Sequence, residues 1–198
     1  MSKLPSTRER LHQVLQALGA SAKKSLGQNF LVSDIVISKI ITQVQNQKPQ
    51  AVFEIGPGAG ALTDYLIQIC EEKKATFQVI ELDRAFADYW RQRGLQVFEE
   101  DALQFDWSKA VQTPRTILVS NLPYQISSSL VIELSVQDIA FDFMTLMFQK
   151  EVAQRIRAQA RSADYGLLSV IAQNFWTIQL VSEAGPKDFD PPPRVAVS

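Results

Sequence analysis

The stretch of residues 52–63 constrains the possible fold more than any other part of this sequence. It opens on a short apolar run, continues with glycine at alternate positions, and takes on a helical pattern from about Ala59. An apolar run bounded by glycine in this way predicts a buried strand, a tight turn and a helix. Gly56, Gly58 and Gly60 permit positive φ angles and let a ligand approach the backbone closely. The turn therefore predicts a ligand site, although glycines needed only for packing would look the same.

A second apolar run, residues 76–80, is followed by Glu81, and this acid strengthens the ligand interpretation. In sheets that bind nucleosides, a carboxylate after the second strand accepts hydrogen bonds from ribose hydroxyls. Glu81 lies at about the expected distance along the chain from the glycine turn. Packing would explain the glycines, but it would not explain Glu54 and Glu81 together. We therefore expect the ligand to be a nucleoside.

Two details of the turn indicate which nucleoside is bound. Pro57 has no N–H group, and the glycine spacing is not the G-x-G-x-x-G of dinucleotide sites, so a pyrophosphate would find few donors. Glu54, just before the turn, would repel phosphate and suit a ligand that carries an ammonium and a sulfonium. S-adenosylmethionine carries both and no phosphate, so we expect it as the cofactor, bound by Gly56, Gly58 and Glu81. An NAD-dependent oxidoreductase is an alternative, although no obvious acid for hydride transfer is present.

Strands and helices alternate along the rest of the chain. We expect strands at residues 52–55, 76–80, 95–98, 116–119, 141–148 and 177–181. Helices are expected at residues 6–18, 34–48, 59–72, 84–93, 150–160 and 165–174, with a further helix capped by Ser127. Strands separated by helices of this size form a mostly parallel sheet with helices on both faces. The expected fold is therefore α/β, of the Rossmann-like type found in S-adenosylmethionine-dependent methyltransferases.

Candidate binding residues follow four successive strands at the point where each ends: Gly56, Glu81, Asp101 and Asn121. The carboxyl ends of parallel strands meet at one edge of a sheet, and ligands bind there. Independent surface residues would have no reason to fall at four strand ends in a row. Asp101 could accept a hydrogen bond from an adenine amino group, or it could cap a turn.

Residues 121–124 suggest the reaction. The lone pair of an exocyclic base amine is delocalised into the ring, so the nitrogen is a poor nucleophile. The Asn121 side-chain oxygen and the Leu122 carbonyl could accept hydrogen bonds from its two N–H groups and localise the lone pair, with Pro123 stiffening the turn. Tyr124 would stack on the base, a contact worth about 1–3 kcal/mol. These residues predict N-methylation of a base, although a proline turn with a packed tyrosine would look the same.

Five segments of the chain resemble the ribosomal RNA adenine N6,N6-dimethyltransferase family and occur in that family's order. They are spread over nearly the whole chain, at residues 24–31, 54–63, 80–84, 121–124 and 189–195. The form of residues 121–124 and the basic loop of residues 22–31 are more similar to the small-subunit, kasugamycin-resistance type. The macrolide-resistance enzymes, which act on large-subunit rRNA, remain an alternative.

The resemblance implies how the cofactor is held. Asn29 and Leu31 would close over the methionine part of S-adenosylmethionine, with Gly56 beneath it. Glu81 would hold the ribose, and Asp101 would hold the adenine. No metal ion takes part in this arrangement.

The resemblance also implies how the substrate is handled. Asn121 would lie beside the methyl donor, and Phe189 would stack on the target adenine opposite Tyr124. Two adjacent adenines near the 3′ end of 16S rRNA would each receive two methyl groups in the assembling small subunit. A base in a hairpin loop is presented at lower cost than a base in a duplex. A chain that kept the fold without turnover, as an RNA-binding assembly factor, is a further alternative.

Composition narrows the class of protein and the compartment in which it is expected. Of 198 residues, 46% are hydrophobic and 21% charged, which is ordinary for a globular protein. Cys70 is the only cysteine and His12 the only histidine, so neither an internal disulfide nor a Cys/His metal cluster can form. We expect Cys70 to be a buried apolar filler. Apolar runs long enough for a signal peptide or a membrane helix are absent, so we expect a cytoplasmic protein. We also expect it to be a monomer.

Basic residues are concentrated in two places, although the net charge is −1. Residues 1–24 hold Lys3, Arg8, Arg10, Lys23 and Lys24 against one acid, and residues 150–161 hold Lys150, Arg155, Arg157 and Arg161 against one acid. Local charge density governs binding to phosphates, so these clusters could form a face for rRNA. Solvated helix faces would have the same composition.

The domain organisation follows from the motifs. We expect an N-terminal helix and a cofactor-covering basic loop in residues 1–32, and a Rossmann-like catalytic domain in residues 33–198. The resembling family carries a further small helical domain after its Pro-Pro-Pro segment, and this chain ends at Ser198. The expectation is a catalytic fragment that binds the cofactor and handles ribosomal substrate poorly.

Overall fold

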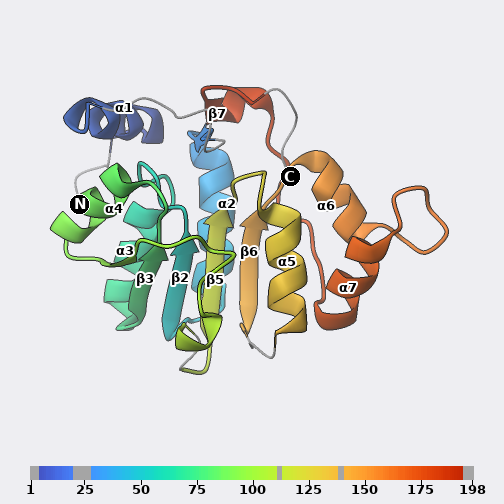
Figure 1. The fold of residues 1–198 in the computed structure, drawn as a ribbon. Helices are drawn as coiled ribbons and strands as arrows, with labels where there is room; N and C mark the ends of the chain where they lie inside the picture. The colour runs from blue at the N-terminus through green and yellow to red at the C-terminus, as the bar shows by residue number, and fades with distance from the viewer. Residues whose placement is uncertain (1–4, 20–27, 111–112, 138–140, 194–198) are drawn as a thin grey trace.

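Figure 1 shows the computed structural model, which describes residues 5–19, 28–110, 113–137 and 141–193. Within them the helices are α1 (Thr7–Ala17), α2 (Asp34–Asn46), α3 (Thr63–Lys73), α4 (Arg84–Gln92), α5 (Ser127–Val136), α6 (Lys150–Arg157) and α7 (Leu167–Phe175). The strands are β1 (Phe30–Leu31), β2 (Ala51–Ile55), β3 (Thr76–Ile80), β4 (Gln96–Phe98), β5 (Thr116–Asn121), β6 (Phe143–Met147) and β7 (Phe189–Asp190). The sequence motifs at residues 24–27 and 194–195 lie outside the described residues.

Five strands form one parallel sheet in the order β4-β3-β2-β5-β6. The central strand is β2, in which Val52 pairs with Phe77 of β3 on one side and with Ile117 of β5 on the other. All five residues of β2 are buried, because a parallel strand with helices on both faces has no side open to water. The predicted parallel α/β sheet is confirmed.

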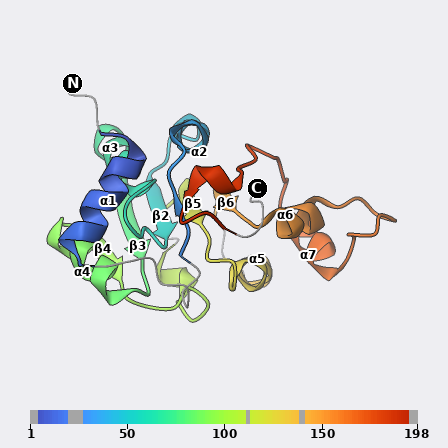
Figure 2. The same ribbon diagram turned by 90° about the horizontal axis from the view of Figure 1, so that it is seen from above.

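Helices cover both faces of the sheet (Figures 1 and 2). On one face, α2 and α3 pack on β2 and β5 through residues such as Ile40 and Leu66. On the other face, α5 packs through Leu130 together with residues 102–110. Beyond the β6 edge, α6 and α7 pack against each other, and α7 packs against α5. This arrangement leaves the carboxyl ends of the strands as the edge where a ligand can enter.

The helix after the glycine turn begins later than the predicted position near residue 59. Gly56, Gly58 and Gly60 have φ angles of 66°, 50° and 92°, which a right-handed helix cannot contain. The chain therefore makes a longer turn, and α3 begins at Thr63. This places the glycine backbone, rather than a helix, at the carboxyl end of β2.

Two further element predictions are wrong. Ser127 does not cap α5, because Ile126 holds the N-cap position and the Ser127 hydroxyl donates to the Tyr124 carbonyl oxygen at 3.1 Å. Residues 177–181 form no strand. They line a groove together with residues of β6, which is the edge strand of the sheet. Within the segment, Ile178 packs against the core cluster of α5, α6 and α7, whereas Leu180 is exposed.

A small antiparallel ribbon was not predicted. Phe30 of β1 pairs with Asp190 of β7, and Leu31 pairs with Phe189. The Val32 N–H group also donates to the Asp188 carbonyl at 2.8 Å. The ribbon joins the segment that carries Asn29 and Leu31 to a segment near the other end of the chain.

No described helix is long and apolar enough to span a membrane. Among the same residues, no three His, Cys, Asp or Glu side chains are grouped as a metal site requires. Cys70 is buried as expected. Burial raises the pKa of its thiol to about 12, so the reactive thiolate is strongly disfavoured.

Candidate active site

A cavity of about 250 Å³ lies at the carboxyl ends of the strands. Its lining includes every predicted site residue except Phe189: Asn29, Leu31, Gly56, Gly58, Glu81, Asp101, Asn121 and Tyr124. These residues come from β1 and the position before it, from the last residue of β5 and from the loops that follow β2, β3, β4 and β5. The structure thus brings together side chains that the sequence could place only at the ends of separate strands.

The glycine turn has little capacity to bind a phosphate. The Gly56 N–H group donates to the Ile80 carbonyl at 2.8 Å, and the Gly60 N–H group donates to the Pro57 carbonyl at 2.9 Å. The Gly58 N–H group donates to Glu81 at 3.0 Å. All three glycine amides are therefore used within the protein, and Pro57 has none. A Cβ added at Gly56 would meet no atom within 4 Å, so the cavity directly faces this glycine.

Glu81 is held in place by the backbone on both sides. One carboxylate oxygen accepts from Asp83 N–H at 2.8 Å and the other from Gly58 N–H at 3.0 Å. Burial raises the pKa of this carboxyl, and these amides act in the opposite direction by stabilising its ionised form. A carboxylate has about four lone-pair sites. Two amides leave acceptor capacity for the two hydroxyls of a ribose.

Asp101 shows features of both interpretations that the sequence allowed. One of its oxygens accepts from Leu103 N–H at 2.9 Å, as in a turn cap. The side chain is half-buried and also lines the cavity. Capping therefore fixes the orientation of a carboxylate that still faces the ligand space.

Asn121 ends β5 with its side chain oriented by the opposite wall of the cavity. Its amide Nδ2 donates to the Asn29 carbonyl at 3.2 Å. With the amide nitrogen engaged in this way, the side-chain oxygen is the atom left to accept from a ligand. The contact also ties the segment at Asn29 to the carboxyl end of β5.

Tyr124 presents a half-buried ring to the same cavity. The ring packs against the core cluster that contains Leu31 and Met147. Burial raises the pKa of Tyr124 to about 12, so the hydroxyl stays neutral. That hydroxyl has no hydrogen-bond partner among the described residues. The ring face, rather than the hydroxyl, is thus the feature available to a base.

Phe189 does not lie where its expected role requires. It is 2% exposed, belongs to the core cluster beneath β1 and β7, and is absent from the cavity lining. In this arrangement it offers no open face to an adenine opposite Tyr124. Its visible function is to anchor the β1–β7 ribbon through its pairing with Leu31.

Comparison with known proteins decides the family. The family model described as ribosomal RNA adenine dimethylase matches residues 19–198. The chain belongs to this family. Ribosomal RNA small subunit methyltransferase A of Bdellovibrio bacteriovorus is 56% identical, over 96% of this chain and 68% of that protein. The protein of the same name from Coxiella burnetii is 42% identical, over 87% of this chain and 67% of that protein.

Solved structures agree with this assignment. A dimethyladenosine transferase from Plasmodium falciparum matches with a TM-score of 0.70 and 28% identity, over 85% of this chain and 60% of that chain. The 23S rRNA methyltransferase ErmE matches with a TM-score of 0.65 and 24% identity, over 86% of this chain and 67% of that chain. At that identity ErmE supports the fold alone. The Rossmann-like methyltransferase fold predicted from sequence is confirmed.

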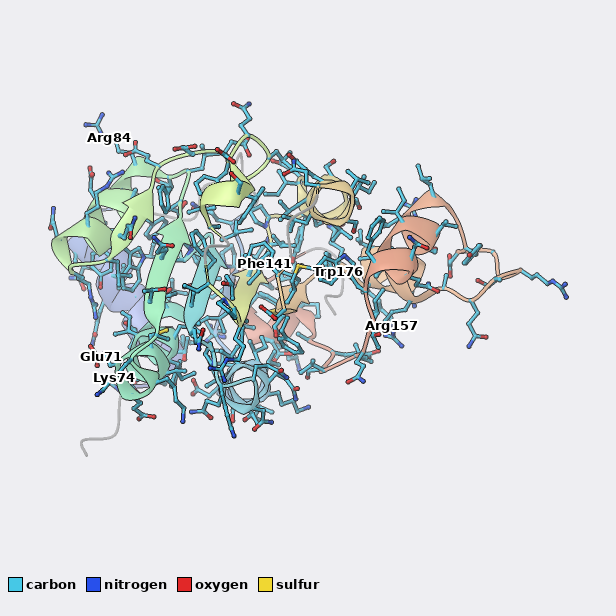
Figure 3. All side chains as sticks on the ribbon, turned by 90° about the horizontal axis from the view of Figure 1, so that it is seen from below. Glu71, Lys74, Arg84, Phe141, Arg157 and Trp176 are labelled. Carbon is cyan, nitrogen blue, oxygen red and sulfur yellow. The ribbon has the colours of Figure 1, made fainter. Side chains whose placement is uncertain are left out.

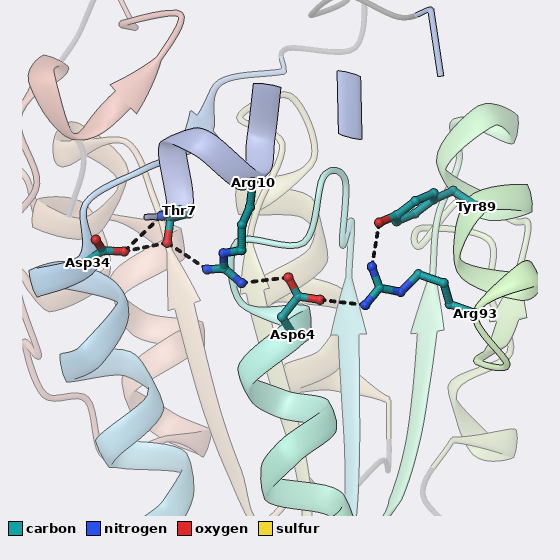
Figure 4. A network of polar contacts seen from close by, with 6 residues as sticks. All are labelled: Thr7, Arg10, Asp34, Asp64, Tyr89 and Arg93. Atoms are coloured by element: carbon teal, nitrogen blue, oxygen red, sulfur yellow. Dashed lines mark hydrogen bonds and ion pairs between the residues drawn. The ribbon is translucent and has the colours of Figure 1, made fainter. Parts of the chain in front are cut away.

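Helix α1 of this adenine dimethylase family member forms part of the cavity wall, through Thr7, Arg10 and Leu11. Arg10, which is 8% exposed, pairs with Asp64 of α3 at 2.7 Å and donates to the Thr7 hydroxyl at 2.8 Å. The Thr7 hydroxyl in turn donates to Asp34 of α2 at 2.6 Å. This network of Thr7, Arg10, Asp34 and Asp64, the α1 clasp, holds α1 against α2 and α3 (Figure 4).

Asp64 has a second partner, Arg93, which follows α4, at 3.3 Å (Figure 4). The Arg10 guanidinium also lies 4.9 Å from the centre of the Tyr65 ring. Sequence patterns did not reveal this clasp, because its members come from separate helices and none belongs to a recognisable motif. The sequence alone indicates only that Arg10 is one of the basic residues of the N-terminal region.

Replacing Arg10 by Met should lower the free energy of unfolding by about 2 kcal/mol. Breaking a buried pair typically costs about 3–5 kcal/mol, and the smaller value follows because Arg93 still compensates Asp64. Urea denaturation measures the change. The matched control is Arg84→Met, since Arg84 extends into solvent (Figure 3) and its side chain is 83% exposed. A change of less than about 0.5 kcal/mol is expected there, and equal effects of both substitutions would contradict a structural role of the clasp.

Proposed function

We propose that this chain transfers methyl groups from S-adenosylmethionine to the N6 atoms of two adjacent adenines near the 3′ end of small-subunit rRNA. The observation that supports this most is the convergence of two sets of residues on one cavity. Gly56, Glu81 and Asp101 suit a nucleoside cofactor, and Asn121 and Tyr124 suit a second base. A reaction between a nucleoside cofactor and a base amine requires both sets side by side.

The cavity fits S-adenosylmethionine better than a dinucleotide. Its glycine amides are used internally, so no phosphate cradle is present in the turn. Glu81 would hold the ribose hydroxyls, Asp101 the adenine amino group, and Asn29 and Leu31 the methionine part. When bound, S-adenosylmethionine supplies a methyl carbon attached to a positively charged sulfur.

The protein's own contribution is to position and polarise the target amine. Asn121 Oδ1 would accept a hydrogen bond from one N6–H group, and the Leu122 carbonyl from the other. Drawing these hydrogens out of the ring plane localises the nitrogen lone pair toward the methyl carbon. The N6 proton lost afterwards can pass to water, because a methylated ammonium of this kind is acidic. The remaining rate enhancement comes from binding itself, which removes the translational and rotational freedom of the two reactants before the reaction.

Kinship favours the small subunit as substrate. The relatives that share 56% and 42% identity carry the name ribosomal RNA small subunit methyltransferase A. Exposed Arg155, Arg157 and Arg161 on and after α6 would contact rRNA phosphates. We place the protein in the cytoplasm as a monomer that acts on assembling small subunits.

Mass mapping of methyl groups on rRNA tests the proposal. Small subunits lacking the modification are incubated with this protein and S-adenosylmethionine, with purified 23S rRNA as a parallel substrate. Two methyl groups on each of two adjacent adenines near the 3′ end of 16S rRNA are expected. Methyl groups on 23S rRNA alone would favour the macrolide-resistance type. Cofactor binding without any methyl transfer would favour an RNA-binding assembly factor.

Replacing Tyr124 by Ala should lower kcat/KM for methyl transfer about 5- to 150-fold. This range corresponds to the loss of one base–aromatic stack, about 1–3 kcal/mol. Tyr124→Phe keeps the ring face and removes a hydroxyl that has no partner among the described residues, so it should retain activity. Calorimetry with S-adenosylmethionine accompanies the rate measurement. Equal loss of cofactor affinity and of rate in Tyr124→Ala would make the residue a packing element.

A further inference from the structure

Glu54 is a buried acid at the cavity, and one of its two carboxyl oxygens lacks a hydrogen-bond partner among the described residues. It lies on β2, is 2% exposed, and lines the cavity beside the glycine turn. Its Oε2 atom has no hydrogen-bond partner among the described residues. A buried polar atom without a partner costs free energy. Such an atom at a ligand cavity indicates a group that the ligand completes.

The surroundings of Glu54 oppose its ionisation. Burial raises the pKa of this carboxyl to about 8, and the negative charges of Asp64 and Glu81 act in the same direction, whereas the Thr63 hydroxyl favours the ionised form. Arg10 brings a positive charge to the same cavity, but it is already paired with Asp64. These surroundings favour the protonated form of Glu54 in the folded protein near pH 7, whereas the sequence predicts a carboxylate.

We propose that Glu54 receives the cationic methionyl end of S-adenosylmethionine and that binding of the cofactor releases the Glu54 proton to water. This inference rests on the proposed cofactor and adds a proton to its binding equilibrium. The Glu54 O–H bond breaks, the proton goes to solvent, and the resulting carboxylate pairs with the ligand's positive charge. Charge is conserved, because one cation enters the cavity as one proton leaves.

An opposite charge within about 4–6 Å lowers a carboxyl pKa by about 1–3 units. The ligand therefore converts Glu54 from the neutral to the ionised form near pH 7. Because the free protein holds the proton and the complex does not, cofactor affinity rises as pH rises toward 8. By linkage, the dissociation constant should fall about 2- to 8-fold between pH 6 and pH 7, depending on how far the ligand lowers the pKa. Above the pKa of the free protein, this dependence should level off.

Isothermal titration calorimetry at pH 7 measures the released proton directly. Titrations with S-adenosylmethionine are repeated in two buffers of different ionisation enthalpy, and the difference in heat gives the number of protons released. Close to one proton per bound cofactor is expected. The same titration with S-adenosylhomocysteine, which lacks the sulfonium, identifies the cation. Release with both ligands assigns Glu54 to the ammonium, and release with S-adenosylmethionine alone assigns it to the sulfonium.

Glu54→Gln keeps the shape of the side chain and removes the titrating proton. This variant should bind the cofactor without proton release and with an affinity nearly independent of pH. The matched control is Glu71→Gln, because Glu71 is an exposed acid at the far end of α3 (Figure 3), and it should behave as the unaltered protein. Cofactor binding without proton release in the unaltered protein overturns this inference and leaves the proposed function intact. Failure of the unaltered protein to bind the cofactor overturns both.

Discussion

Replacing Asn121 by Ala is expected to reduce the rate of methyl transfer at least about a hundredfold while cofactor affinity falls less than about tenfold. Removal of one preorganised hydrogen-bonding group that acts on the transition state typically costs a factor of about 10² to 10³ in rate. Asn121 would act on the transition state through its side-chain oxygen. Its Nδ2 donates to the Asn29 carbonyl at 3.2 Å, so the oxygen is the atom left to accept a hydrogen bond in the cavity. A contact with the bound cofactor that is the same before and during the reaction contributes to affinity and not to the rate of the chemical step, so the loss of rate reports the action of Asn121 on the amine.

Single-turnover methyl transfer at saturating cofactor, together with calorimetric affinity, separates these two effects for Asn121→Ala. The matched control is Asn174→Ala, since Asn174 is exposed on α7 and lies outside the cavity lining. That control should retain both rate and affinity. A loss of rate in Asn121→Ala that is no larger than its loss of affinity would remove Asn121 from the reaction and leave it as a cofactor contact.

Replacing Glu81 by Ala should weaken binding of S-adenosylmethionine by about 1–3 kcal/mol, or about 5- to 150-fold. The ribose hydroxyls lose their acceptor, and the two amides of Gly58 and Asp83 lose theirs as well. The glycine turn should therefore also loosen. The free energy of unfolding falls in the same variant for this second reason.

Calorimetry measures the change in affinity for Glu81→Ala, and Glu72→Ala on the exposed side of α3 serves as the matched control. Glu81→Gln keeps one acceptor oxygen and should fall between the unaltered protein and the alanine variant. Unchanged affinity in Glu81→Ala would exclude Glu81 from the cofactor site. A fall in stability with intact affinity would make it a turn-holding residue only.

The sheet and most of the site could be predicted because their signals are local. Buried parallel strands such as β2 appear as apolar runs, since neither face is open to water. The positions of Glu81, Asp101 and Asn121 followed from the ends of those runs, because parallel strands all point their carboxyl ends to one edge. Element boundaries were less accurate where glycine conformation was involved, as at the start of α3.

The glycine turn shows where local reasoning gave an incomplete account. Packing accounts for Gly60 and does not account for Gly56. A side chain at Gly56 would project into open space, whereas one at Gly60 would meet the Trp90 ring at 2.8 Å. The Trp90 indole N–H group also donates to the Gly58 carbonyl at 2.9 Å. No sequence pattern links Trp90 to this turn, because it reaches the turn from another helix.

The sequence by itself determined the parallel sheet, the phosphate-poor turn and the residues at the strand ends, because periodicity, glycine and proline act within a few residues. Only the tertiary structure decided which side chains are paired, buried or charged. It placed α1 at the cavity through Arg10 and Asp64, joined β1 to β7 and thereby buried Phe189, and enclosed Glu54 without a partner. These properties depend on burial and on contacts between distant segments. They arise when the chain is folded and have no local signature.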